Sequence, residues 1–269
     1  MNAALRGRSR AAVFLSYHSV TEDGPPYLSL RPRTFERQLD VLSRKGFRSG
    51  TRADLDRLAA GERLRGRRVF LTFDDGFLDT VDTALPRMRE RGFSGMVFVL
   101  PRHLDEGAAL DWPEVAGEAA RRPELMRSID WPMAERLVEA GWEIGSHTLT
   151  HTRLTTLSDE DLRQELLDSR RLIADRLGRC DTLAYPFGVW DPRVAAAAAD
   201  AGYAFAFSLP FGQQLRATPL SIPRVMVDDR DASWRFRVKL SQAGRTALFS
   251  PLKPLARKAL RRRPHSHAE

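Results

Sequence analysis

Cysteine is almost absent from this sequence, which contains only Cys180. No disulfide can therefore form within the chain, and the cysteine content indicates no compartment. A nucleophilic thiol also needs a neighbouring base, and since no motif places one near Cys180, we expect this residue to pack in the core. The sequence also lacks a secretory signal and an apolar run long enough to span a bilayer. These absences favour a cytoplasmic protein or one attached to a membrane surface.

Acidic residues are fewer than basic ones. The sequence contains 35 Asp and Glu and 43 Lys and Arg, which gives a formal net charge of +8. Basic residues gather in an N-terminal segment at 1–10 and in a tail at 241–269, and these flank a predicted domain at 11–240. The tail interleaves its charges with leucines. It is either a solvated segment or a basic amphipathic one that rests on anionic lipid or on a partner. We expect no nucleic-acid partner, since neither stacking aromatics nor a recognition motif accompanies the charges.

Short apolar runs alternate with helical patterns through the predicted domain. Strands are predicted at 13–17, 69–73, 95–100, 142–146, 182–185, 204–209 and 222–227, and helices at 34–47, 80–93, 132–142, 158–178 and 192–203. The helix at 158–178 is delimited by a capping box of Ser158 and Asp161 and by Gly178 at its end. This alternation indicates a parallel sheet of βαβ units, close to a (β/α) barrel, and 105–126 looks like an insertion.

Polar residues follow four of the predicted strands. They are His18 after the first strand, Asp74 and Asp75 after the second, Ser146 and His147 after the fourth, and Pro186, Phe187 and Gly188 after the fifth. In barrels of this type the carboxyl ends of the strands carry the active site. We therefore expect these strand ends to converge on one pocket.

The segment "SHTLTH" contains two histidines, His147 and His151, at a spacing that brings two imidazoles together on a turn. Such a pair is common and alone is weak evidence for a metal. Two adjacent carboxylates, Asp74 and Asp75, strengthen it, because like charges side by side favour either open water or a nearby cation. Two histidines and one carboxylate leave positions on a divalent ion for water and substrate, while the second carboxylate is free to act as a base.

The motifs "TFDDG", "SHTLTH" and "YPFG", in this order and after these strands, resemble those of the polysaccharide deacetylase family, the carbohydrate esterases that share the NodB homology domain. The resemblance covers roughly residues 11–230. It implies a distorted (β/α)7 barrel of a single domain, in which a metal-activated water removes an acetyl group from a sugar. It also implies a divalent metal cofactor, with zinc as the first candidate and cobalt or manganese as alternatives.

The resemblance assigns roles to particular residues. Asp74 would be the general base, and Asp75 would bind the metal together with His147 and His151. The backbone N–H of Phe187, between Pro186 and Gly188, would help to hold the oxyanion.

Two departures from the family pattern stand out. The family commonly has an arginine two residues before the proline of "YPFG", where it orients the base, but this chain has Ala184 there. Arg224 is a candidate substitute. The family's last motif also carries a catalytic histidine, and "SIPRVMVDDRD" contains none.

His18 is the candidate for the missing acid. In a circularly permuted subset of the family the strand that carries this histidine comes first, and "FLSYHSV" is similar to that opening. In a permuted barrel the strand at 13–17 would lie beside the strand at 222–227, and His18 would face the metal pocket from the side opposite Asp74. Otherwise His18 is a histidine that only satisfies hydrogen bonds in the core or in a loop.

The expected substrate is an acetylated sugar or glycan, with an N-acetyl group favoured over an O-acetyl group. A lipid-linked intermediate would suit a cytoplasmic enzyme and would give the basic tail a use as a peripheral membrane contact. Two alternatives remain open at this stage. One is a catalytically weak or inactive glycan-binding protein on the same barrel, and the other is an amidase that acts on small non-peptide amides.

Overall fold

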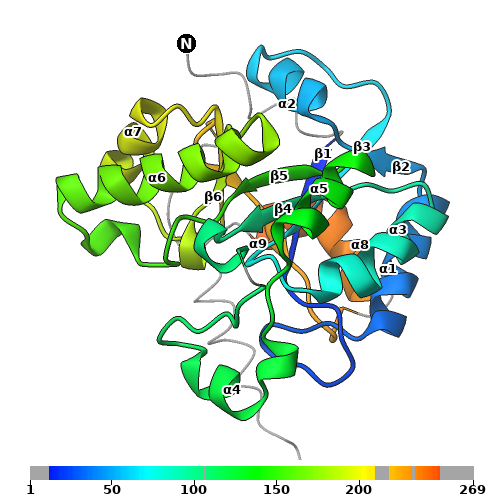
Figure 1. The fold of residues 1–269 in the computed structure, drawn as a ribbon. Helices are drawn as coiled ribbons and strands as arrows, with labels where there is room; N and C mark the ends of the chain where they lie inside the picture. Colours follow the sequence, from blue (N-terminus) through cyan, green and yellow to red (C-terminus); the bar gives the residue numbers. More distant parts are fainter. Residues whose placement is uncertain (1–11, 106, 210–217, 232–233, 249–269) are drawn as a thin grey trace, which may run out of the picture.

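The computed structural model describes residues 12–105, 107–209, 218–231 and 234–248. The predicted basic segment at 1–10 lies outside these residues, and so does the part of the predicted tail at 241–269 that follows residue 248. Within the described residues the chain forms one twisted parallel sheet with helices around it (Figure 1). No helix of this part of the chain is both long and apolar enough to cross a bilayer.

The sheet is nearly closed into a barrel. Its strands are β1 (Ala12–Tyr17), β2 (Phe47–Ser49), β3 (Arg67–Phe73), β4 (Met96–Val99), β5 (Glu143–Ser146), β6 (Thr182–Ala184), β7 (Phe205–Ser208), β8 (Ile222–Pro223) and β9 (Val225–Met226). Their order is β8-β7-β6-β5-β4-β3-β1-β9, with β2 paired to the first residues of β3. The segment 222–226 closes the sheet, because β8 pairs with β7 and β9 pairs with β1, all in parallel. The fold is therefore a distorted (β/α)7 barrel, as the sequence predicts.

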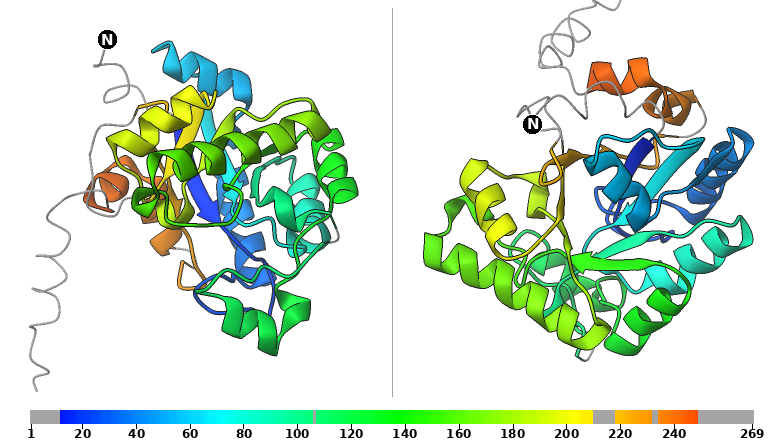
Figure 2. Two further views of the ribbon diagram at one scale, coloured as in Figure 1. Left: turned by 60° about the vertical axis from the view of Figure 1, so that its left-hand side comes forward. Right: turned by 90° about the horizontal axis from the view of Figure 1, so that it is seen from above.

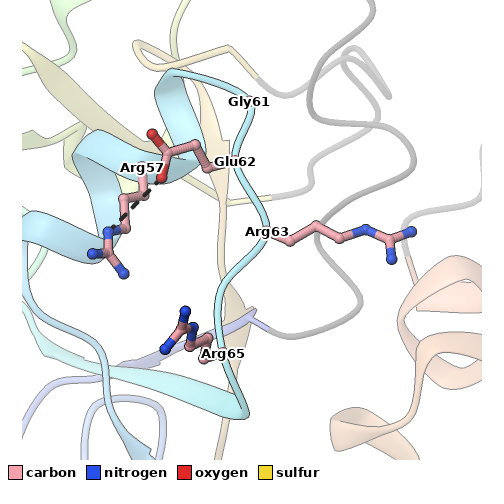
Figure 3. A pocket seen from close by; sticks show the side chains of 5 residues that line it. All are labelled: Arg57, Gly61, Glu62, Arg63 and Arg65. Carbon is pink, nitrogen blue, oxygen red and sulfur yellow. Dashed lines mark ion pairs between the residues drawn. The ribbon is translucent and has the colours of Figure 1, made fainter.

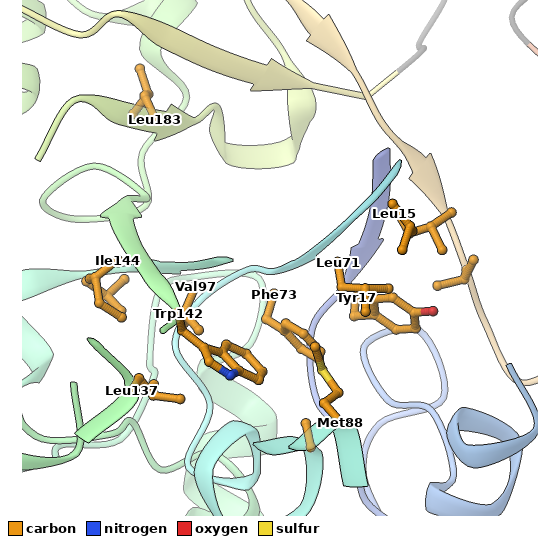
Figure 4. Packing of buried hydrophobic residues seen from close by; sticks show 14 of the residues in the cluster. Leu15, Tyr17, Leu71, Phe73, Met88, Val97, Leu137, Trp142, Ile144 and Leu183 are labelled. Carbon is orange, nitrogen blue, oxygen red and sulfur yellow. The ribbon is translucent and has the colours of Figure 1, made fainter. Parts of the chain in front are cut away.

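The strands place alternate side chains in two apolar layers, as the period of two in a strand requires. Leu71 and Phe73 of β3 belong to the cluster between the sheet and its surrounding helices, part of which Figure 4 shows. Phe70 belongs instead to a second cluster, with Phe98 of β4 and Phe207 of β7. This second cluster fills the interior of the barrel.

Helices pack around the outside of the sheet (Figure 2). Those of the described residues are α1 (Pro32–Arg44), α2 (Arg52–Ala59), α3 (Leu85–Glu90), α4 (Ala116–Arg121), α5 (Trp131–Glu139), α6 (Asp159–Leu177), α7 (Pro192–Asp200), α8 (Trp234–Leu240) and α9 (Gln242–Leu248). Of these, α4 lies apart from the sheet, below the strands in Figure 1. The boundaries predicted for α6 are confirmed, because Ser158 Oγ accepts the Asp161 N–H and Gly178 takes a left-handed conformation at φ 79°.

Other boundaries differ from the prediction. The helix expected at 34–47 ends at Arg44, and β2 begins at 47. The helix expected at 80–93 begins with a wider π-helical turn at Thr80–Ala84 before α3, where Pro86 has no N–H to donate. α2 was not predicted, although Thr51 and Asp54 form a reciprocal capping box at its start. The insertion at 105–126 contains α4 and contributes most of a third apolar cluster.

Cys180 packs in the core, as the sequence predicts. Its side chain is buried, and this burial raises the pKa of the thiol to about 12. A thiol in this state does not ionise at neutral pH, so it is not a nucleophile.

A basic pocket lies near the amino end of β3, between the end of α2 and the start of the strand (Figure 3). Its lining includes Arg57, Arg63 and Arg65, and Arg57 Nε lies 3.9 Å from Glu62 Oε2. The polar residues singled out in the sequence follow the carboxyl ends of the strands instead. The arginine pocket is therefore at the opposite end of the barrel from the candidate site.

Candidate active site

The two adjacent carboxylates after β3 point in different directions and have different neighbours. The Asp74 N–H donates to Tyr17 O at 3.0 Å, so Asp74 extends the pairing of β1 with β3. Asp75 then takes a left-handed backbone conformation at φ 70°, which costs a non-glycine residue roughly 1 to 3 kcal/mol. Gly76 is also left-handed, and a Cβ on it would lie 3.1 Å from Val99 Cγ1. This tight turn directs Asp74 toward the barrel interior and Asp75 toward the histidines.

Asp74 is held by a buried bidentate ion pair with Arg224. Arg224 Nη1 lies 2.6 Å from Asp74 Oδ1 and Nη2 lies 2.8 Å from Oδ2, while Nη1 also donates to Thr72 Oγ1 at 2.9 Å. Burial raises the pKa of Asp74, but the Arg224 guanidinium, with the nearby imidazoles, more than offsets this and holds the pKa well below its usual range. Asp74 is therefore ionised at neutral pH.

Arg224 reaches Asp74 from the segment that closes the barrel. It lies between β8 and β9, its N–H donates to Ser208 O at 2.9 Å, and its side chain is 0% exposed. The guanidinium carbon is 5.5 Å from the centroid of the Phe98 ring and 6.0 Å from that of Phe207, within the range of cation–π contacts. Ala184, where the family pattern has its arginine, belongs to the same interior cluster as these rings. An arginine from the closing segment thus lies against the aromatic rings of this interior cluster.

Asp75, His147 and His151 form a buried cluster whose ligand atoms lie within 4.8 Å of one another. Asp75 Oδ1 is 3.3 Å from His147 Nε2 and 3.4 Å from His151 Nε2. Two ligands on one tetrahedral zinc ion are separated by about 3.4 Å when each bond is about 2.1 Å long. Within the described residues neither carboxylate oxygen of Asp75 accepts a hydrogen bond. A buried carboxylate without donors is costly, so a divalent ion fits this cluster.

His147 is oriented by the neighbouring strand. Its Nδ1 lies 2.8 Å from Ala184 O, which leaves Nε2 directed at Asp75, as is usual for a histidine that binds a metal. The loop that follows is held by α6, because Glu165 Oε1 accepts the N–H groups of Leu149 and Thr150 at 3.0 and 2.6 Å. Sequence reasoning missed Glu165. Its signal is a charged residue on the face of α6 that also carries the buried Leu162 and Leu166.

His151 is oriented by aromatic packing instead. Its Nδ1 is buried and has no hydrogen-bond partner in the described part of the chain. The ring stacks on Trp112 at a centroid distance of 4.0 Å and meets the edge of Phe187 at 4.7 Å. Trp112 comes from the insertion at 105–126, which therefore forms one wall of the site. No local sequence pattern connected Trp112 with a histidine on another loop.

His18 lies in the site, but not where the sequence reasoning put it. Its Nε2 is 4.0 Å from Asp74 Oδ2, so it is beside Asp74 and not on the opposite side of the pocket. The strand register explains this, because Tyr17 of β1 is the partner of Phe73 of β3, and His18 and Asp74 are the next residues along. The predicted pairing of β1 with the segment 222–226 is also present, since Leu15 is opposite Val225.

The turn at Pro186–Gly188 brings Phe187 next to the cluster. Phe187 has a left-handed backbone conformation at φ 58°, and the Arg153 guanidinium lies 3.9 Å from the centroid of its ring. Gly188 is required here, since a Cβ on it would lie 2.4 Å from Leu209 Cβ. Among the described residues no backbone oxygen accepts the Phe187 N–H.

The surroundings shift the pKa values of the two histidines in opposite directions. Burial lowers the pKa of His151 to about 3, so its imidazole is neutral and able to bind a metal. Burial also lowers the pKa of His147, but Asp75 and Asp74 outweigh this and raise it above its usual value. A proton and a divalent ion compete for His147, so the affinity for metal falls as the pH falls.

Comparison with known proteins agrees with the fold and the site. A family model described as polysaccharide deacetylase matches residues 61–206, which is more than half of the chain. The chain belongs to the polysaccharide deacetylase family. The circular permutation that we infer from "FLSYHSV" stays a prediction, as do the domain limits 1–10, 11–240 and 241–269.

The similar proteins include members of this family from bacteria. The chain is 22% identical to YxkH of Bacillus subtilis over 191 residues, or 70% of this chain and 61% of that protein. It is 28% identical to a chitooligosaccharide deacetylase of Sinorhizobium fredii over 142 residues, or 51% of this chain and 54% of that protein. The chain thus spans only about half to three fifths of these curated relatives.

Among solved structures, IcaB from Ammonifex degensii superposes with a TM-score of 0.71 and 22% identity. The match covers 87% of this chain and 99% of that chain. At this identity the likeness shows the fold alone.

We predict that Asp75→Ala and His147→Ala each abolish tight binding of zinc, because two protein ligands hold a divalent ion poorly. Isothermal titration calorimetry on metal-stripped protein measures this, with His103→Ala as the control for loss of a histidine outside the cluster. Unchanged zinc affinity in either variant contradicts the ligand set.

We predict that Arg224→Met destabilises the fold by about 3 to 5 kcal/mol, because it leaves Asp74 as a buried and uncompensated charge. The double variant Arg224→Met/Asp74→Asn should recover much of that loss. Urea unfolding of the metal-free protein measures both, and Arg65→Met, in the exposed pocket, is the matched control. A loss no larger than that of the control contradicts the argument.

Proposed function

We propose that this chain is a metal-dependent hydrolase that removes acetyl groups from a carbohydrate, with N-acetyl groups favoured over O-acetyl groups. The proposal is carried by two groups of side chains that lie in the same site. The first is the cluster of Asp75, His147 and His151, which fits a divalent ion. The second is the pair of Asp74 and His18, whose side chains are 4.0 Å apart. A metal-dependent deacetylation of an amide uses both a metal site and groups that move protons.

The ligand set of two imidazoles and one carboxylate suits zinc first, with cobalt or manganese as alternatives. When bound, the ion supplies Lewis-acid activation of a water molecule and of the acetyl carbonyl. The proton transfers and the stabilisation of the oxyanion are assigned to side chains and backbone groups of this chain.

Asp74 is proposed as the general base. Arg224 keeps it ionised at neutral pH and fixes both of its oxygens, so Asp74 accepts a proton without having to rotate. The same ion pair makes Asp74 a weak base. It would therefore accept a proton only from a water molecule whose pKa a bound metal ion has lowered.

His18 is proposed as the acid that protonates the leaving amine. An amine leaves poorly without a proton, so an N-acetyl substrate needs this group more than an O-acetyl substrate does. His18 lies next to Asp74, and this position supports roles for the two residues as acid and base in the same reaction. The Phe187 N–H, which has no backbone acceptor among the described residues, is proposed to donate to the carbonyl oxygen as negative charge develops on it.

The substrate class is proposed to be an acetylated sugar or oligosaccharide. The names of two curated relatives, both chitooligosaccharide deacetylases, favour this class. A lipid-linked substrate and a membrane contact through the basic tail stay predictions, since the charged residues of that tail from 253 onward lie outside the described residues.

The test is acetate release from N-acetylated and O-acetylated oligosaccharides by metal-stripped protein, with and without added Zn²⁺, Co²⁺ or Mn²⁺. A set of small linear and cyclic amides in the same assay examines the amidase alternative. We expect metal-dependent release from at least one N-acetylated sugar and none from the amides. No release from any sugar contradicts the proposal.

We predict that Asp74→Asn retains the metal but lowers turnover by roughly 10²-fold or more, because the asparagine cannot accept the proton. Metal content and kcat, measured on the same preparation, test this. Asp82→Asn, which changes an exposed residue, is the control. Turnover close to that of the parent would place the base elsewhere.

We predict that His18→Ala leaves metal binding and fold intact and lowers turnover on an N-acetyl sugar by roughly 10² to 10⁴. The loss should be confined to substrates whose leaving group must be protonated, because His18 serves only that step. Hydrolysis of an aryl acetate, whose leaving group needs no proton, should change little. Parent-like turnover of the N-acetyl sugar would exclude His18 as the acid, and His103→Ala serves as the control.

A further inference from the structure

The position of His18 depends on its backbone. The nearest carboxylate oxygen, Asp74 Oδ2, is 4.0 Å from His18 Nε2, which is too long for a hydrogen bond. β1 ends at Tyr17, so His18 is the first residue that the strand pairing no longer holds. Whatever fixes the next residues of the chain therefore sets the distance between His18 and Asp74.

Asp79 binds the two residues that directly follow His18. Asp79 Oδ2 accepts a hydrogen bond from Ser19 Oγ at 2.5 Å, and Oδ1 accepts one from the Val20 N–H at 2.8 Å. A length of about 2.5 to 2.7 Å is typical of a hydroxyl that donates to an ionised carboxylate. One carboxylate thus holds both a side chain and a backbone group of the same loop.

Ser19 also connects the two ends of this loop through its backbone hydrogen bonds. Its N–H donates to Leu28 O at 3.1 Å, and its carbonyl accepts the Leu30 N–H at 3.0 Å. Val20, next to it, is fully buried. A shift of Ser19 would therefore move His18 on one side and the segment that leads to α1 on the other.

Asp79 belongs to the same short stretch as the other site residues of β3. It is four positions after Asp75 in the chain, and it precedes the π-helical turn at Thr80–Ala84. The stretch 74–79 therefore carries the proposed base, one metal ligand and the group that holds the loop of His18. One short segment thus carries both Asp74 and the carboxylate that holds the loop of His18.

We propose that Asp79 is a positioning residue for His18, which it holds at the distance from Asp74 that protonation of the leaving group requires. The inference rests on the proposed function. Asp79 touches neither the substrate nor the metal ligands in this role, and it acts only through Ser19 and Val20. Its loss should therefore affect only those reactions that need His18.

The test is a double-mutant cycle between Asp79→Ala and His18→Ala, with an N-acetyl sugar and an aryl acetate as substrates. Asp79→Ala should lower kcat on the N-acetyl sugar by roughly 10- to 100-fold, the loss expected from misplacing a reacting group by about 1 Å. KM, zinc affinity and the rate on the aryl acetate should stay close to those of the parent. In the His18→Ala background, Asp79→Ala should cause no further loss.

Two further variants keep the test valid if Asp79→Ala does not fold. In Asp79→Asn the amide oxygen can still accept the Val20 N–H, and the amide nitrogen can donate to Ser19 Oγ. This variant should therefore keep most of the activity of the parent protein. Ser19→Ala removes one of the two hydrogen bonds and should show a smaller loss, again only on the N-acetyl sugar. Asp82→Ala, an exposed neighbour, should behave as the parent.

Equal losses on both substrates, or losses that add in the double variant, overturn the inference, because a general structural role predicts them. Parent-like kcat in Asp79→Ala overturns it as well. A parent protein that releases no acetate from any N-acetylated sugar contradicts the proposed function itself, and the two failures are thereby distinguished.

Discussion

The buried ion pair between Arg224 and Asp74 is the interaction on which the site depends. Arg224 lies at the point where the sheet closes, between the residues that pair with β7 and those that pair with β1. Closure of the barrel therefore brings a guanidinium to a carboxylate that burial would otherwise protonate. Without this pair Asp74 would not be a fixed anion beside the metal cluster, so the fold and the proposed chemistry rest on the same contact.

Backbone strain in the described residues is concentrated at this site. The non-glycine residues with positive φ there are Asp75, Thr148, His151 and Phe187, and each lies in or next to the proposed metal cluster. Such conformations persist only when the surrounding structure imposes them. Here Glu165 holds the loop after His147, and Thr148 Oγ1 accepts the His151 N–H at 3.2 Å. The strained turns direct the ligand atoms inward before any ion binds.

Much of the fold could be predicted from the sequence, because apolar runs, caps and glycine stops are local signals. The strand-end positions of Asp74, Asp75 and His147 belong to this class. The side of the pocket on which His18 lies could not be read locally, since it follows from the direct pairing of β1 with β3 across two intervening helices. Trp112 was missed for a similar reason, because its contact depends on how the insertion packs.

The measurement that tests the central claim most directly is a crystal structure of the protein grown with Zn²⁺, with the ion located by anomalous diffraction. The account predicts one ion bound by Asp75, His147 and His151, with Asp74 still paired to Arg224 and outside the coordination sphere. An ion bound by Asp74, or the absence of any ion from this cluster at saturating zinc, would contradict it.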